Sequence, residues 1–427
     1  MQKNGLILFC LILMLSLVSC NSCNKKPVRE TTKNPPKELR GINFFLETSA
    51  SMEGYMRGNS DFSKTIPNFL VDIEGRVKFT NKTIHINYIS DSISKYRGTT
   101  RDFIHDISTT KVAVANSSQM HKIFEAVTNA TDSNDISILV SDCILSFADE
   151  HIRANKEINV QKADGELKAF VKDAFLKMKS RNVCATVYGL TSKFFGTYYT
   201  YQNNKILLKG DVLRPYYIWI IGNQELVQQF NKQLSEISGF APELAISFGM
   251  FDKPIDKYTL LFKTGHEGEW TFDDNHLKDV EITKKQPAKF NIAVDLSKLP
   301  AYARDLTYLK NNVKLVNSDL QAKIVSIKNA DEMDMNKAAP KEKGPLLDAT
   351  HVINLEVTDL YQSTGTIVLE LPLRYDLAYK DWSVMDDRNV AGIGRKTFAF
   401  EHLVDGIREA YQNNNENYVH ITINLKK

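Results

Sequence analysis

Residues 42–52 read INFFLETSASM, and the architecture of the N-terminal half is best approached from this segment. Its first part, 42–46, is a short apolar run, which is typical of a buried strand. Its second part, 47–52, turns to an acidic residue followed by small side chains with hydroxyl groups. In α/β proteins, ligands bind beyond the carboxyl ends of the strands. The segment therefore predicts a buried strand with a candidate site directly after it.

Beyond residue 52, strand-like runs alternate with segments whose apolar residues recur at helical spacing. The expected strands are 42–46, 85–89, 136–145, 183–190 and 216–221, and the expected helices are 63–77, 119–128, 167–179 and 225–237. A hairpin is expected over 198–213, with its turn near 203–204. This alternation predicts an α/β domain over residues 41–238, with a mostly parallel, doubly wound, Rossmann-like sheet covered by helices on both faces.

Residues 239–427 have a different pattern of apolar residues, because strand-like segments follow one another and helical spacing is clear only at 400–411. About 390 residues also exceed what one hydrophobic core usually serves. We therefore expect a second domain over 239–427 that is β-rich and sandwich-like. Its expected strands are 244–248, 258–263, 269–272, 290–296, 321–327, 351–357 and 366–371.

The first 19 residues have the pattern of a cleavable signal peptide. Lys3 precedes an apolar run over 5–18, which is shorter than the about 20 residues of a transmembrane helix. The run ends in Leu-Val-Ser-Cys at 17–20, which resembles the lipobox of bacterial lipoproteins, whose cysteine is acylated. The resemblance implies a lipid such as palmitate on Cys20 and an anchor in a membrane of the cell envelope. Asn21, in place of an acidic residue, favours the outer membrane over the inner one.

Residues 20–40 are polar and contain proline, a composition typical of a flexible tether. The chain has 54 Lys and Arg and 51 Asp and Glu; without Lys3 of the leader, 53 basic side chains exceed the acidic ones by two. This balance gives no argument for nucleic acid as a partner. Cys143 and Cys184 lie in strand-like runs, so we expect buried thiols there, with a disulfide between them as the alternative.

Three short motifs in order resemble the metal-ion-dependent adhesion site of the von Willebrand factor A family. Residues 47–51, Glu-Thr-Ser-Ala-Ser, follow the first strand, where the family has Asp-x-Ser-x-Ser. Ser118, or its neighbour Ser117, precedes an expected helix where the family has threonine, and Asp142 follows a strand where the family has an aspartate. Over residues 41–238 the resemblance implies an A-type domain with an Mg²⁺ site, for which Ca²⁺ or Mn²⁺ are the alternatives. The implied ligands are Glu47, Ser49, Ser51, Ser118 and Asp142.

Two positions depart from the family's pattern. Glu47 stands where aspartate is usual, and its extra methylene moves the carboxylate by about 1.5 Å, one C–C bond, although Mg²⁺ tolerates little displacement of its ligands. Cys143 stands where the family has glycine. The alternative to a metal site is that Thr48, Ser49 and Ser51 only cap the next turn.

In metal-competent members of the family, the open coordination position accepts a carboxylate of a partner protein. By implication this chain would bind an acidic side chain of another protein, with Met52, Tyr55 and Met56 either at the rim of the contact or packed under the loop. The alternatives are a metal-independent scaffold subunit of an envelope complex and, with less support, a metal-dependent hydrolase. The sequence has no H-E-x-x-H, G-x-S-x-G or P-loop motif, so we expect a binding protein and not an enzyme.

One further segment, residues 375–387, combines acidic and aromatic side chains. This mixture is found in carbohydrate sites, and a solvated loop is the alternative interpretation. The residues concerned are Tyr375, Asp376, Tyr379, Asp381, Trp382, Asp386 and Asp387.

Overall fold

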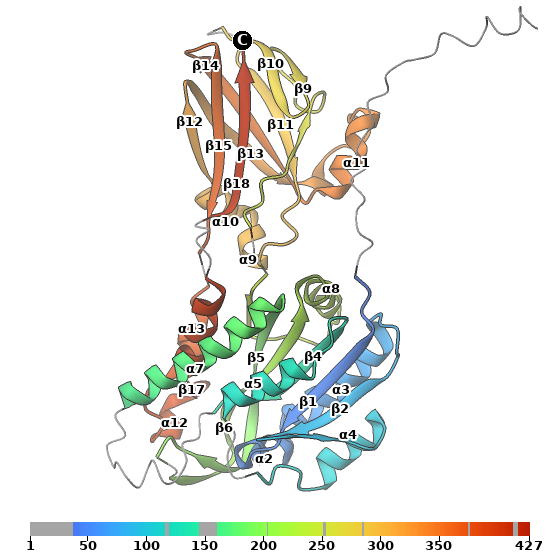
Figure 1. Ribbon diagram of the computed structural model, residues 1–427, viewed down its shortest axis with the longest axis vertical. Coiled ribbons are helices and arrows are strands. Elements are labelled where there is room, and N and C mark those ends of the chain that lie inside the picture. The colour runs from blue at the N-terminus through green and yellow to red at the C-terminus, as the bar shows by residue number, and fades with distance from the viewer. Residues whose placement is uncertain are drawn as a thin grey trace, which may run out of the picture. The chain divides into compact units, whose positions relative to one another are not determined.

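The computed structural model describes residues 37–115, 119–144, 160–202, 204–250, 253–283, 286–374, 376–412 and 417–427 (Figure 1). The expected lipidation site at Cys20, most of the expected tether and the candidate ligand Ser118 lie outside these ranges. Within these ranges, no helix has both the length and the apolar character needed to cross a membrane.

The first half of the chain builds a seven-stranded sheet with the order β3-β2-β1-β4-β6-β5-β7. Strand β1, Gly41–Glu47, lies between β2, Ile84–Ile89, and β4, Asp135–Ser141, and is parallel to both. Antiparallel pairs complete the sheet on either side, through β3 (Ile93–Lys95), β6 (Lys205–Asn223), β5 (Val183–Tyr199) and β7 (Leu244–Phe248). The domain is therefore a mixed α/β structure, with its parallel pairs confined to β2-β1-β4.

The departure from a mostly parallel sheet comes from one long hairpin. Strands β5 and β6 pair from Val183↔Asn223 to Tyr199↔Lys205, so the hairpin is longer than the expected 198–213. A connection this short cannot carry the crossover that parallel neighbours require, so the second strand must run antiparallel to the first. Strand β6 then lies between β4 and β5.

Helices cover both faces of the sheet (Figure 1). Successive side chains of a strand point to opposite faces, so Phe44 and Phe45 of β1 join different cores. Phe44 packs in the core with α3 (Phe62–Arg76), α4 (Thr100–Thr109) and α8 (Gln224–Ser235). Phe45 packs in the core with α5 (Met120–Asn129), α7 (Val160–Ser180) and α13 (Phe400–Tyr411).

The helix starts follow from local sequence. Helix α4 begins with a capping box, in which the Thr99 side chain accepts from the Asp102 N–H and the Asp102 carboxylate accepts from the Thr99 N–H at 2.9 Å. Helix α8 begins after Asn223, whose side chain accepts from the Glu225 N–H at 3.2 Å. These bonds satisfy main-chain donors that the first turn of a helix leaves without partners.

Residues 253–374 and 417–427 build a β-rich part of two mostly antiparallel sheets, with orders β12-β15-β18-β10-β9 and β13-β14-β11-β8. The sheets pack around one core, which includes Ile292 and Leu355 of the second sheet and Ile367 and Ile421 of the first. This confirms the expectation of a β-rich second part. The elements are β8 (Thr259–Leu261), β9 (Glu269–Asp273), β10 (His276–Glu281), β11 (Ala288–Val294), α9 (Ala301–Arg304), α10 (Leu306–Asn312), β12 (Lys314–Ser318), β13 (Leu320–Asn329), η2 (Ala330–Glu332), α11 (Pro340–Asp348), β14 (His351–Leu360), β15 (Thr364–Pro372) and β18 (Asn417–Lys426).

Between β15 and β18 the chain contributes residues 376–412 to the α/β part. Helix α13 packs along α7, where Lys168 Nζ and Lys172 Nζ lie 2.5 Å and 3.2 Å from the carboxylate of Glu409. Residues 376–399, which precede α13, are called the C-terminal strap below. The strap contains η3 (Ala378–Trp382), β16 (Ser383–Val384), α12 (Val390–Ile393) and β17 (Thr397–Phe398). The α/β part thus uses β7, the strap and α13, all of which follow the expected boundary at residue 238.

Candidate cation site

The loops after β1 and β4 meet at one edge of the sheet. Because these strands are adjacent and parallel, Glu47 at the end of β1 and Asp142 just after β4 lie at neighbouring strand ends. On the other side, Ser49 pairs with Ala115 through a parallel β-bridge. The structure therefore brings two of the three motifs together, and Ala115 stands three residues before Ser118, which lies outside the described ranges.

Oxygen atoms from both loops gather at this edge. The Ser141 hydroxyl donates to Glu47 Oε2, and a main-chain N–H donates to Asp142 Oδ1 at 3.0 Å. The hydroxyl groups of Ser49 and Ser51 are hydrogen-bonded to each other at 2.9 Å. Asp142 Oδ2 is buried and accepts no hydrogen bond of ordinary geometry within the described residues, although the Ser51 hydroxyl is near enough to favour the charged carboxylate.

Both carboxyl groups are withdrawn from water, since Glu47 is 1% exposed and Asp142 0% exposed. Burial, reinforced by the negative charge of Glu47, raises the pKa of Asp142 to about 7. Two neighbouring carboxyl groups in a buried site resist being charged together unless a positive charge compensates them. The site is therefore short of positive charge at neutral pH.

The donor set fits a hard divalent cation. Carboxylate and hydroxyl oxygens are the ligands that Mg²⁺ and Ca²⁺ prefer in proteins, and among the described residues Asp142 Oδ2 is buried with no hydrogen bond of ordinary geometry. Within the described residues, no three His, Cys, Asp or Glu side chains form a metal-binding group. A cation here would thus depend on two carboxylates, Glu47 and Asp142, together with the hydroxyls of Ser49 and Ser51.

The capping interpretation of the hydroxyl residues is wrong. The two short helices that follow, η1 (Ala50–Met52) and α2 (Glu53–Met56), begin without a side-chain capping hydrogen bond. Instead, the Thr48 hydroxyl donates to the Ile89 carbonyl at 3.3 Å, and Ser49 and Ser51 bond each other. The serine hydroxyls therefore face the site and not the next turn.

Met52, Tyr55 and Met56 do not form a rim. Their side chains are buried in the core with α3, and the Tyr55 hydroxyl donates to the Pro215 carbonyl at 2.5 Å. The alternative of packing under the loop is the one that the structure supports.

Cys143 occupies a backbone conformation that favours glycine, with φ of +54°. The side chain is nevertheless buried, and its Sγ accepts from Trp219 Nε1 at 3.4 Å. The glycine of the family pattern would take this conformation without strain. Cys184 is also a buried thiol, and no disulfide joins the two cysteines.

Sequence reasoning missed a buried arginine at this edge. Arg214 of β6 is 0% exposed, and its Nη2 donates to the Tyr198 hydroxyl oxygen at 3.3 Å. The Tyr198 hydroxyl in turn donates to Asp387 Oδ2 at 2.7 Å. Nothing in the sequence around Arg214 distinguishes it from a charged residue on a strand surface.

Asp387 belongs to the acidic and aromatic segment 375–387, but it is buried, so neither a solvated loop nor a carbohydrate site describes it.

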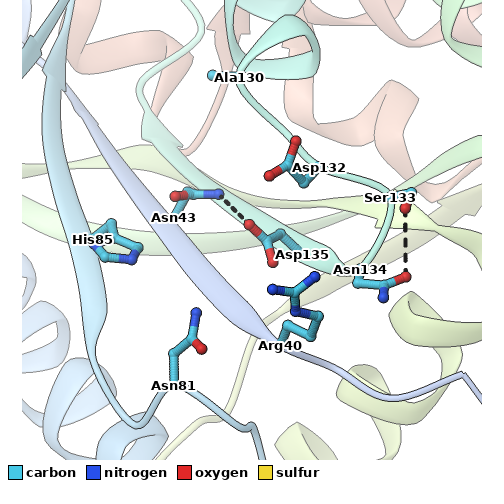
Figure 2. Close-up of a pocket in the computed structure, with 9 residues that line it drawn as sticks. All are labelled: Arg40, Asn43, Asn81, His85, Ala130, Asp132, Ser133, Asn134 and Asp135. Carbon is cyan, nitrogen blue, oxygen red and sulfur yellow. Dashed lines mark hydrogen bonds between the residues drawn. The ribbon is translucent and has the colours of Figure 1, made fainter.

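A second polar feature lies at the opposite edge, where β1, β2 and β4 begin. It is a depression of about 410 Å³. Asn43 Nδ2 donates to Asp135 Oδ2 at 3.5 Å across it, as Figure 2 shows. The lining carries both signs of charge and no Phe, Tyr or Trp, and it comprises Arg40, Asn43, Asn81, His85, Ala130, Asp132, Ser133, Asn134 and Asp135.

No protein family, curated protein or solved structure matches this chain.

Proposed function

We propose that this protein is a lipid-anchored component of the bacterial cell envelope that binds a partner protein through a von Willebrand factor A-type domain containing a divalent cation. The lipobox-like segment ending at Cys20 supports the anchor. One observation carries the rest of the proposal. Glu47, Ser49, Ser51 and Asp142 belong to two loops at one edge of the sheet, where Asp142 Oδ2 is buried with no hydrogen bond of ordinary geometry among the described residues.

The order of strands supports the A-type assignment. The strand that carries the first motif, β1, is flanked by parallel neighbours, and the strand that carries Asp142, β4, is one of them. In a doubly wound domain these positions place two loops side by side at the ligand-binding edge. The hairpin of β5 and β6 is an elaboration on the far side of β4.

In this proposal, Glu47, Ser49, Ser51 and Asp142 hold the cation, with Ser118 as the further ligand expected from the motif. The bound cation, Mg²⁺ or alternatively Ca²⁺ or Mn²⁺, would supply the positive charge that the buried carboxylates lack. The chain's own residues fix the loops after β1 and β4. Ser51 is partly exposed, whereas both carboxylates are buried, so an acidic side chain of the partner approaches from the side of Ser51.

The test is thermal unfolding of a chain that lacks residues 1–23, first in EDTA and then with Mg²⁺, Mn²⁺ or Ca²⁺. A cation at 100 times its dissociation constant stabilises the native state by about 2.7 kcal/mol. Asp142→Asn and Ser49→Ala should abolish the shift. Asp91→Asn, at an exposed turn position after β2, is the matched control and should keep it. Absence of a shift with all three cations would contradict the cation-dependent form.

A metal-independent scaffold is the second candidate, and Arg214 is the observation that favours it. This buried guanidinium already places a positive charge near Asp142, whose charged form it stabilises. The scaffold form predicts that the full-length protein, cross-linked in its own envelope, captures the same partner in EDTA and in Mg²⁺. Loss of the partner in EDTA, restored by Mg²⁺, would exclude it.

A further inference from the structure

Arg214 stands where the hairpin of β5 and β6 extends past the end of β4. Tyr217 of β6 pairs with Ser141, the last residue of β4, and Arg214 is three residues further out at the same edge. Its guanidinium lies 4.5 Å from the centre of the Tyr198 ring. Nη1 donates to the Gly394 carbonyl at 3.0 Å. Burying a charged group is costly, and Nε has no hydrogen-bond partner among the described residues. The contacts of Nη1, Nη2 and the Tyr198 ring therefore fix where the charge lies.

The C-terminal strap supplies the contacts that hold Arg214. Gly394 belongs to the strap, and so does Asp387, which accepts from the Tyr198 hydroxyl at 2.7 Å and from the Tyr201 N–H at 3.0 Å. The strap is also bonded to β6 through Thr397 Oγ1, 3.1 Å from the Tyr217 hydroxyl oxygen. The strap therefore holds the guanidinium at the edge of the sheet where β4 ends.

The positive charge of Arg214 acts on the C-terminal strap and on the candidate cation site. It lowers the pKa of Asp387 in the strap, against the stronger effect of burial. The register of β4 and β6 also puts Arg214 at the edge of the sheet where Asp142 follows β4. We infer that Arg214, held in place by the C-terminal strap, determines the cation affinity of the site formed by Glu47, Ser49, Ser51 and Asp142. This inference rests on the proposed function, because it presupposes a cation at that site.

The physical reason is repulsion between two positive charges in a buried place. Arginine cannot release its proton in a protein, so its charge is permanent. Charges withdrawn from solvent are also poorly screened by salt. A divalent cation beside Asp142 must share the carboxylates with the guanidinium.

Removing the guanidinium and neutralising its carboxylate partner should therefore act in opposite directions. Arg214→Met leaves the carboxylates to the cation and should tighten binding by about tenfold or more at the effective dielectric of protein interiors. Arg214→Lys keeps the charge and should bind within about threefold of wild type. Asp387→Asn leaves Arg214 charged but deprived of its counter-charge, so binding should weaken.

The experiment is isothermal titration of Ca²⁺ and Mg²⁺ into the chain that lacks residues 1–23, for wild type and these three variants. Arg97→Met, at an exposed position, is the matched control and should bind as wild type does. Circular dichroism in EDTA checks that each variant is folded. If Arg214→Met does not fold, Arg214→Gln, which removes the charge and keeps hydrogen-bond donors, takes its place and should tighten binding in the same way.

The outcomes separate this inference from the proposed function. Tighter binding in Arg214→Met, with Arg214→Lys near wild type, supports the inference, even if wild type itself binds no cation. Wild-type affinity in Arg214→Met, or stronger binding in Asp387→Asn, overturns the inference and leaves the proposed cation site standing. No binding in any variant overturns both.

Discussion

As the pH rises from about 4 to about 8, the wild-type protein should lose part of its free energy of unfolding because Asp142 becomes charged. Replacing Asp142 by asparagine should remove this loss. Burial and the neighbouring Glu47 raise the pKa of Asp142 from an ordinary 3.8 to about 7 in the folded state. The folded chain therefore holds this proton more tightly than the unfolded chain does. Protonation stabilises the fold, so the contribution is complete below pH 3.8 and is lost as the pH rises through about 7.

The size of the effect follows from the two pKa values. The difference between 3.8 and about 7, at about 1.4 kcal/mol per pH unit, corresponds to about 4 kcal/mol. No reduction for solvent screening is needed, because Asp142 is 0% exposed. A saturating divalent cation should shrink the loss, since it stabilises the charged carboxylate that EDTA leaves uncompensated.

The assay is urea unfolding in EDTA at a series of pH values, for wild type and Asp142→Asn side by side. Titrating groups distant from the site contribute equally to both proteins, so the difference between their free energies of unfolding reports Asp142 together with its interaction with Glu47. Glu47→Gln is the second variant, and it should move the loss to higher pH only if Glu47 stabilised the charged form. Because Glu47 does the reverse, the loss should be smaller and should end at a lower pH. Parallel curves for wild type and Asp142→Asn would refute the reasoning.

Three further predictions concern stability alone. Cys143→Gly should leave the protein about 1 kcal/mol more stable than Cys143→Ala, because φ of +54° strains any side chain; equal midpoints in urea would contradict this. Gly54→Ala should destabilise by more than about 2 kcal/mol, since a Cβ there meets an aromatic ring of β5, whereas Gly75→Ala, in open space on α3, should stabilise by about 0.5–1 kcal/mol; thermal unfolding of both tests the contrast. Tyr198→Phe removes a donor from a buried carboxylate and should cost about 1–3 kcal/mol in urea unfolding, and a cost near zero would show that Asp387 is neutral there.

The central strands and helices could be predicted because each has a clear local pattern, either an apolar run for a strand or apolar residues at helical spacing for a helix. Residues 42–46 form part of β1, and the apolar spacing of 63–77 becomes α3, which begins one residue earlier and ends at Arg76. The meeting of Glu47 and Asp142 was also predictable, because parallel neighbours end at the same edge of a sheet. Local pattern and topology agree in this part of the chain.

The rest depended on contacts that are distant in sequence. The long hairpin places β6 between β4 and β5, and an apolar run such as YYIWII at 216–221 has the same composition in either direction. Helix α13 was expected at 400–411 and forms there, but its packing on α7, more than 200 residues earlier, is a tertiary choice. Arg214 carries no local signal, because its role comes from Asp387 and Gly394, which lie more than 170 residues away.

The position of β18 has a consequence for how the chain matures. In the five-stranded sheet it lies between β15 and β10, and its residues, Asn417–Lys426, follow every other strand of that sheet in the chain. While the chain is synthesised from its N-terminus, the strands of this sheet therefore first form two separate pairs, each with an edge open to wrong pairing. Strand β18, the last of these strands to be synthesised, joins the two pairs by pairing with β15 and β10.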